Sequence, residues 1–299
     1  MDAFAPPPGY TEWPAPPALR DAVACLWAQV TTSAADRAGL VLPDGCTDLV
    51  WEQGRGAFVA GPDTGPVFTT MAAGTVVLGV RFRPSAGGPA LGVPLSDLRD
   101  QRVDLADLRA AEASRLPATL DPDTAAARVL EVTASLVADG APDPAVTWAA
   151  HLLGDPRARA EDVADEVGLS LRQLRRRCHA AVGYGPKTLQ RVLRFRRFVA
   201  RIDTRAQSPG DLDLAALAAE AGFADQAHLT RECGRLSGLT PAALARQRSR
   251  EERSGLPEKA RSVHALPRQG GQPLNGVDAV LLTGILRGEY GDQVVPAAA

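Results

Sequence analysis

The sequence has few of the residues that build disulfide frameworks and metal centres. Only four of its 299 residues are cysteines, and no two of them form a Cys-x-x-Cys pair. This wide spacing argues against both a disulfide framework and a four-thiolate zinc site, so we expect thiols buried in the core. The cysteines are Cys25, Cys46, Cys178 and Cys233.

Histidine is equally scarce, and its positions exclude one class of enzyme. The four histidines are His151, His179, His228 and His264, so none lies in the strand-rich first part of the chain. A metal-dependent barrel enzyme needs imidazole ligands on its strands. We therefore expect no metal site and no cofactor.

Long apolar runs are also missing. No stretch approaches the 18 or more apolar residues that a bilayer-spanning helix needs. Residues 1–8 have neither the basic start nor the apolar run of a secretory signal. We expect a cytoplasmic protein that does not enter a membrane.

The net charge of −2 hides a strong segregation of charge. Residues 1–156 carry 10 basic and 19 acidic side chains, a net charge of −9, whereas residues 157–250 carry 18 and 10, a net charge of +8. The remaining residues carry 5 and 6, a net charge of −1. A compact basic segment is typical of a nucleic-acid-binding module, although a solvated helix surface can have the same composition.

The length allows two domains, and the sequence pattern changes between them. Short runs rich in β-branched and aromatic residues, separated by Gly and Pro turns, predict strands over about 40–83 in a small antiparallel barrel or sandwich. Small helices are expected from about 84 to 138, before a Pro-rich linker at 140–144. We predict an α+β protein with a barrel-like N-terminal domain at 1–139, an all-α domain at 145–250 and a flexible tail at 251–299.

The basic segment contains an internal repeat. Residues 162–169 (DVADEVGL) match 216–223 (ALAAEAGF), and in both copies a helix ending at glycine is followed by a turn and a second helix. Capping residues, among them Asp143, Ser170 and Asp213, and first-turn prolines mark the expected helix starts. A helix, a glycine-containing turn and a second helix form the helix-turn-helix arrangement, whose second helix enters the major groove of DNA. A long basic and apolar helix, predicted over 186–202, joins the two units.

The repeat resembles the tandem helix-turn-helix domain of AraC/XylS-type transcriptional regulators. The second copy, 222–231 followed by 238–241, carries the most specific likeness, and 163–176 is similar to the first unit of the family. The resemblance covers roughly residues 145–250 and implies a sequence-specific DNA-binding regulator that is not an enzyme. Where the family commonly has Phe this chain has Cys178 and Cys233, a change that should loosen the packing.

Six residues of the two second helices are the candidate DNA contacts. If Ser170 caps the first of these helices, three arginines lie opposite its apolar side, and arginine can contact guanine bidentately. Matching the family pattern favours Arg172, Arg175, Gln226 and Thr230 as base readers, with Arg176 and Arg231 shared between bases and backbone. Each arginine could instead contact only phosphate or solvent, since half or more of protein–DNA hydrogen bonds go to phosphate and sugar.

The same resemblance implies the partners. They are double-stranded promoter DNA read in the major groove and an unidentified small-molecule effector of the N-terminal domain, with RNA polymerase and a second copy of the chain as further candidates. In that domain, Asp44 and Asp48 could be a polar pair in a pocket, or Asp44 could bond its own turn. Arg81 and Arg83 share one face of a strand, either to meet an anionic ligand or to face solvent.

Two other functions compete with a regulator. The first is a DNA-repair alkyltransferase-type fusion, which needs a thiolate cluster, whereas the first half of the chain supplies only Cys25 and Cys46. The second is a small-molecule-binding enzyme that uses the N-terminal barrel.

Overall fold

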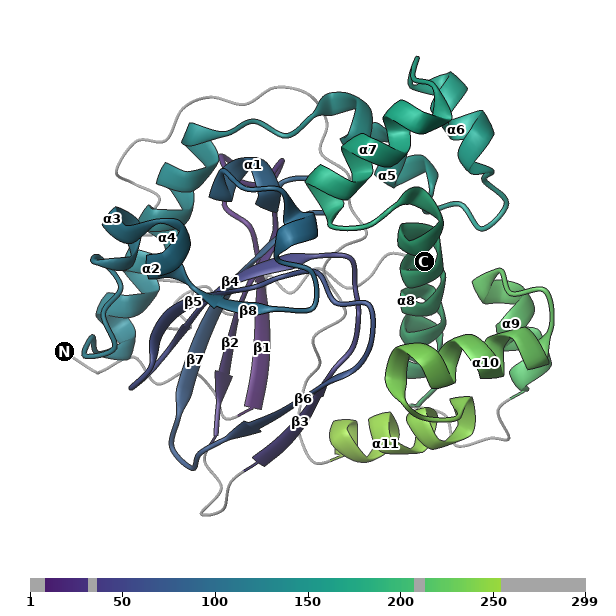
Figure 1. Ribbon diagram of the computed structural model, residues 1–299. Coiled ribbons are helices and arrows are strands. Elements are labelled where there is room, and N and C mark those ends of the chain that lie inside the picture. Colours follow the sequence, from purple (N-terminus) through teal and green to yellow (C-terminus); the bar gives the residue numbers. More distant parts are fainter. Residues whose placement is uncertain (1–8, 32–36, 207–212, 254–299) are drawn as a thin grey trace.

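The computed structural model describes residues 9–31, 37–206 and 213–253 (Figure 1). Its first part is built on a six-stranded antiparallel sheet in the order β1-β2-β7-β4-β5-β8, while β3 and β6 form a separate two-stranded ribbon. The strands are β1 (Gly9–Pro14), β2 (Val23–Val30), β3 (Arg37–Val41), β4 (Thr47–Glu52), β5 (Gly56–Ala60), β6 (Val67–Met71), β7 (Val76–Phe82) and β8 (Arg102–Asp104).

Alternation along the strands gives the sheet two different faces. Leu78, Val80 and Phe82 of β7 face a large apolar core, whereas Val77 belongs to a smaller cluster on the opposite face. Short helices and one long helix cover the side of the large core. They are α1 (Gly87–Leu91), a 3-10 turn (Leu95–Asp97), α2 (Leu105–Leu108), α3 (Ala110–Ala113) and α4 (Pro122–Asp139).

The predicted α+β class is confirmed, but the sheet is not a closed barrel. Within the described residues β1 and β8 are the two edges of the six-stranded sheet, because β3 and β6 pair with each other instead of continuing it. The sheet also extends beyond the predicted strand region of about 40–83 at both ends. Strands β1 and β2 precede that region, and β8 follows it. Strand β2 is buried on both faces, so its sequence is largely apolar and lacks the alternation of apolar and polar residues that marks a half-exposed strand.

The second part is entirely helical. Its core contains Cys178 and Cys233, both fully buried as predicted. The predicted starts at Asp143, Ser170 and Asp213 are confirmed, since each side chain accepts a hydrogen bond from a first-turn amide. The helices are α5 (Pro144–Leu152), α6 (Ala160–Glu166), α7 (Leu171–Val182), α8 (Pro186–Ala206), α9 (Leu214–Ala221), α10 (Gln226–Ser237) and α11 (Pro241–Arg253). Most of the predicted tail lies outside the described residues.

The two parts pack against each other where α7 meets α1 and the 3-10 turn, and where α8 meets the loop at residues 44–45. Gly183 ends α7 with a φ of 89°, and a Cβ there would lie 2.4 Å from the ring of Pro62. Only glycine therefore fits both the left-handed turn and this contact. A hydrogen bond of 2.8 Å between the hydroxyl groups of Ser85 and Thr147 adds a second link. No helix in the described part of the chain is long and apolar enough to cross a membrane.

Candidate nucleic-acid interface

The first helix-turn-helix unit consists of α6, a turn at Gly168 and α7. The turn needs a positive φ of 67° at Gly168, and Ser170 then begins α7 with a full capping box. The Ser170 hydroxyl accepts from the amide of Gln173, whose side chain in turn accepts from the Ser170 amide at 2.9 Å. This reciprocal cap fixes the start of the helix that carries the predicted arginines.

The two sides of α7 separate apolar from basic residues, as predicted. Leu174 and Cys178 are fully buried. The three predicted contacts Arg172, Arg175 and Arg176 are exposed, and none of them forms a hydrogen bond or ion pair with another described residue.

Arg177, the next residue of α7, behaves differently. It donates to the carboxylate of Asp143 at 3.1 Å and is only partly exposed. The arginines on the exposed side therefore keep their donors available for an external acceptor, whereas Arg177 already has one.

The second unit repeats this arrangement in α9, a turn at Gly222 and α10. Asp225 caps α10 by accepting from the amide of His228 at 2.6 Å. Gln226, Thr230 and Arg231 are exposed, opposite the buried Leu229 and Cys233. The Thr230 hydroxyl donates to the carbonyl of Gln226 within the helix, and Arg231 has no intramolecular partner among the described residues.

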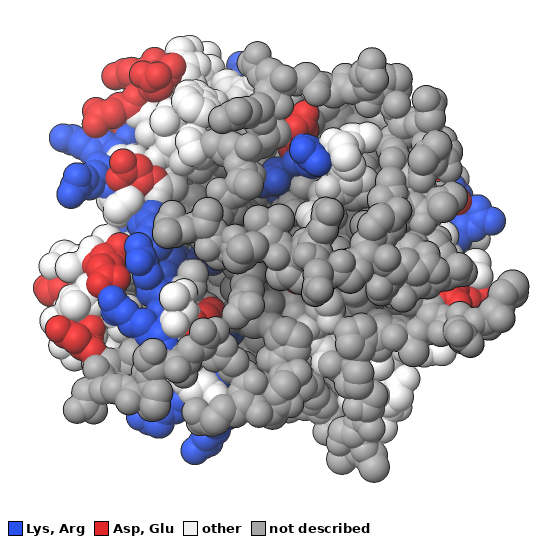
Figure 2. Space-filling view, turned by 180° about the vertical axis from the view of Figure 1, so that it is seen from behind, with Lys and Arg blue, Asp and Glu red and all other residues white. Residues whose placement is uncertain are grey.

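Helix α8 sets the distance between the units. Its 21 residues correspond to about 31 Å, close to the roughly 34 Å between successive major grooves on one side of DNA. Figure 2 shows Lys and Arg side chains gathered along the edge of the molecule that the helical part occupies. The helix connects firmly to the second unit, because Arg191 pairs with Glu232 at 2.8 Å and Arg248 pairs with Asp203 at 2.5 Å.

The sheet contains a buried ion cluster that the sequence did not predict. Arg81 of β7 is inaccessible to solvent and lies within 3.3 Å of carboxylate oxygens from Glu12, Asp44 and Asp48. Burial opposes its charge, but Tyr10 and the carboxylates outweigh burial and raise the pKa of Arg81 well above its usual value. The guanidinium group therefore remains charged in the interior of the protein.

This cluster decides the roles left open for these residues. Arg81 does not face solvent, and its donors are already engaged by carboxylates, so it is not positioned to receive an anionic ligand. Asp44 bonds its own turn, as one of its two expected roles requires, because one oxygen accepts from the amide of Cys46 at 2.9 Å, while its other oxygen pairs with Arg81. Arg83 is separate from the cluster and donates to the carbonyl of Arg20 at 2.7 Å.

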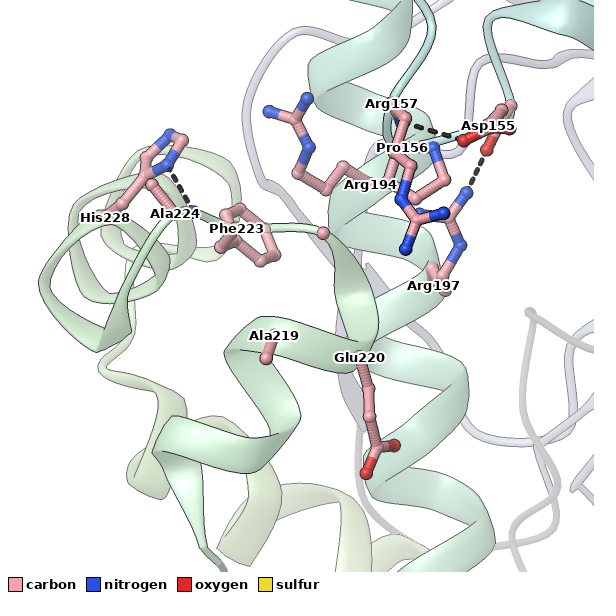
Figure 3. Close-up of a pocket in the computed structure, with 12 residues that line it drawn as sticks. Asp155, Pro156, Arg157, Arg194, Arg197, Ala219, Glu220, Phe223, Ala224 and His228 are labelled. Atoms are coloured by element: carbon pink, nitrogen blue, oxygen red, sulfur yellow. Dashed lines mark hydrogen bonds between the residues drawn. The ribbon is translucent and has the colours of Figure 1, made fainter.

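A hollow between the two units was also missed by the sequence analysis. Figure 3 shows that Arg157, Arg194, Arg197 and His228 line it, from the turn after α5, from α8 and from α10. The sequence signal was the run of arginines along 186–202, but their spacing alone does not show which of them share this hollow.

Comparisons with known proteins agree with this architecture in part. Residues 163–247 match a family described as a helix-turn-helix domain, and residues 11–104 match one described as a domain of unknown function (DUF6597). No curated protein sequence matches the chain.

Structures of ToxT from Vibrio cholerae are similar to this chain. One at 1.65 Å resolution has 9% sequence identity and a TM-score of 0.39, covering 74% of this chain and 97% of that one. Another, with an unsaturated fatty acid bound, has 11% identity and a TM-score of 0.37, covering 81% and 96%. At these identities and TM-scores the likeness transfers no ligand and no activity to this chain.

The family match falls on the two capped units, whose second helices carry exposed arginines that have no partner in the described part of the chain. The chain therefore carries a C-terminal helix-turn-helix domain of AraC type and is a DNA-binding transcription regulator.

Proposed function

We propose that one chain reads two adjacent major-groove sites of promoter DNA, one with α7 and one with α10. Arg172, Arg175, Gln226 and Thr230 contact base edges, while Arg176 and Arg231 are shared between bases and backbone. The observation that carries this proposal is that the four predicted arginine contacts are exposed and form no ion pair among the described residues, because an arginine without an internal carboxylate can offer all its donors to DNA.

The proposal assigns residues 1–139 to a sensing domain, 140–144 to a linker and 145–250 to the DNA-binding domain. A small-molecule effector bound by the sensing domain modulates DNA binding in the cytoplasm, where RNA polymerase or a second copy of the chain are further partners. The contacts of α7 with α1 and the 3-10 turn, and of α8 with the loop before β4, support this coupling, since they connect the helices of the DNA reader to the first part.

Fluorescence anisotropy of the full chain on a duplex selected from a random library tests the proposal. Affinity should fall steeply with salt, log K decreasing by about 0.9 per neutralised phosphate for each unit of log salt concentration. Selection should also enrich two half-sites about one helical turn apart. Binding that is undetectable, insensitive to salt or indifferent to sequence contradicts the proposal.

A further inference from the structure

The hollow between the two helix-turn-helix units has a volume of about 830 Å³ and lies between the turn after α5, helix α8 and the start of α10 (Figure 3). Its walls touch each other at Gly222, where φ is 87° and a Cβ would lie 2.1 Å from Pro156. We call this hollow the inter-unit pocket, and it bridges the first unit to the second.

Two arginines of the inter-unit pocket have side chains that form no hydrogen bond or ion pair with another described residue. Arg194 has one weaker contact, since its guanidinium carbon lies 5.8 Å from the centroid of the Phe223 ring. Arg194 is half-buried, its Nε is inaccessible to solvent without a hydrogen bond, and it forms no ion pair within the described residues. Burial lowers the pKa of Arg194, and the nearby Glu232 opposes this effect only in part. Arg157 is exposed, and only its backbone amide is engaged, by the carboxylate of Asp155 at 2.8 Å.

The other charged groups of the pocket are committed to the fold. Arg197 donates to the carbonyl groups of Gly154 and Ala221 and so connects the two walls. Glu220 is paired with Arg205 at 2.7 Å and lies 3.7 Å from Arg201. Asp155 forms no ion pair with a guanidinium group among the described residues, but it lies near enough to Arg197 for its charge to oppose the lowering of that arginine's pKa by burial.

His228 adds an imidazole N–H donor. Its Nδ1 accepts from the amide of Ala224 at 3.3 Å, and its ring meets Phe223 edge-on with centroids 5.3 Å apart. Because Nδ1 accepts a hydrogen bond, the proton of the neutral ring resides on Nε2. The pocket thus offers two guanidinium groups and an imidazole N–H, which is a donor set suited to phosphate oxygens.

We propose that the inter-unit pocket binds a phosphodiester of the DNA backbone between the two major-groove sites, with Arg194 and Arg157 as the phosphate ligands. The proposal rests on the proposed function, since α7 and α10 in successive grooves leave the intervening backbone opposite the surface between the units. The contact carries no base information. It positions both units on the duplex together.

The test compares Arg194→Gln and Arg157→Gln with two controls of equal charge change. Arg201→Gln lies on the same helix in an ion pair with Glu220, and Arg55→Gln lies in the N-terminal sheet. Each pocket variant should weaken binding of the full chain to its selected duplex about tenfold or more, and reduce the salt slope by about 0.9, with unchanged base preference. Both control variants should keep an affinity and a salt slope close to those of wild type. The melting temperature of Arg194→Gln should stay close to that of wild type, because the variant loses no hydrogen bond or ion pair within the described residues and only the contact of Arg194 with the Phe223 ring.

Duplexes with neutral methylphosphonates sharpen the test. Replacing the phosphates between the half-sites should weaken wild-type binding and abolish the difference between wild type and Arg194→Gln. Unchanged binding by both pocket variants, while Arg175→Ala still weakens it, overturns this inference and leaves the proposed function standing. Failure of the wild-type chain to bind duplex overturns both. A third outcome also overturns this inference, in favour of a small-anion site. In that outcome millimolar inorganic phosphate stabilises the wild-type chain but not Arg194→Gln, and the two bind duplex DNA with the same affinity.

Discussion

The guanidinium group of Arg196 in α8 donates a hydrogen bond of 3.3 Å to the backbone carbonyl of Asp44, a residue 152 positions earlier in the chain. The side chain of Asp44 pairs with Arg81 in the sheet, so one residue joins the buried ion cluster to the helix between the two DNA-reading units. A change in the position of Asp44 within the ion cluster would therefore act on a backbone carbonyl that α8 holds by a hydrogen bond.

Removing the hydrogen bond between Arg196 and Asp44 should increase local opening in both segments that it joins. In Arg196→Met we expect faster amide hydrogen exchange in the loop at 42–46 and at the start of α8, because the Asp44 carbonyl loses its partner. Exchange in β7 should be unchanged. Arg201→Met, a substitution on the same helix that removes only a partly exposed pair with Glu220, is the control. Equal protection of the loop in wild type and Arg196→Met would show that Asp44 does not couple the two parts.

The buried cluster should be far more important for stability than any surface pair. Arg81→Met leaves Glu12, Asp44 and Asp48 without their shared cation, and breaking a buried pair in this way costs about 3–5 kcal/mol. Arg99→Met removes a pair with Asp100 that is 3.9 Å apart and about half-exposed, so it should cost less than about 1 kcal/mol. Urea unfolding of both variants measures the difference. Similar losses for the two would contradict the role assigned to Arg81.

The helical half was predictable because its signals are local. The capping residues Ser170 and Asp213 and the helix-ending glycine Gly222 act within a few residues of their own positions, and the structure places each as expected. The exposed side of α7 followed from helical spacing alone, since Leu174 and Cys178 define the buried side. What these exposed arginines contact stays a prediction.

The ion cluster and the inter-unit pocket were not predictable because distant segments build them. The carboxylates around Arg81 lie 33 to 69 positions away along the chain, and strand order alone brings them together. The pocket likewise needs α8, the turn after α5 and the start of α10 in their folded positions. Strand β2 was missed for another reason, since burial on both faces removes the alternation that marks a strand.

The four cysteines should be unreactive in the folded protein. All are buried, and burial raises the pKa of Cys178 to about 12. The thiolate is the reactive form, so at about pH 8 a thiol reagent should label the native chain very slowly and all four cysteines after unfolding in urea. A raised folded pKa also means that stability falls as the pH rises from the unfolded thiol value toward about 12. Fast labelling of Cys178 without denaturant would contradict its placement in the core.

Arg175 and Arg177 provide a matched test of base reading on a single helix. Arg175 is exposed without an internal partner, whereas Arg177 is held by Asp143 at 3.1 Å. Arg175→Ala should therefore lower affinity by about 1–3 kcal/mol at one base-pair position and relax the preference there. Arg177→Ala should leave base preference unchanged, since its guanidinium group is engaged within the protein. Binding to a panel of single-base operator variants measures both effects. If Arg175→Ala instead weakens binding uniformly across the panel, its contact is to phosphate, because a phosphate ligand cannot distinguish one base pair from another.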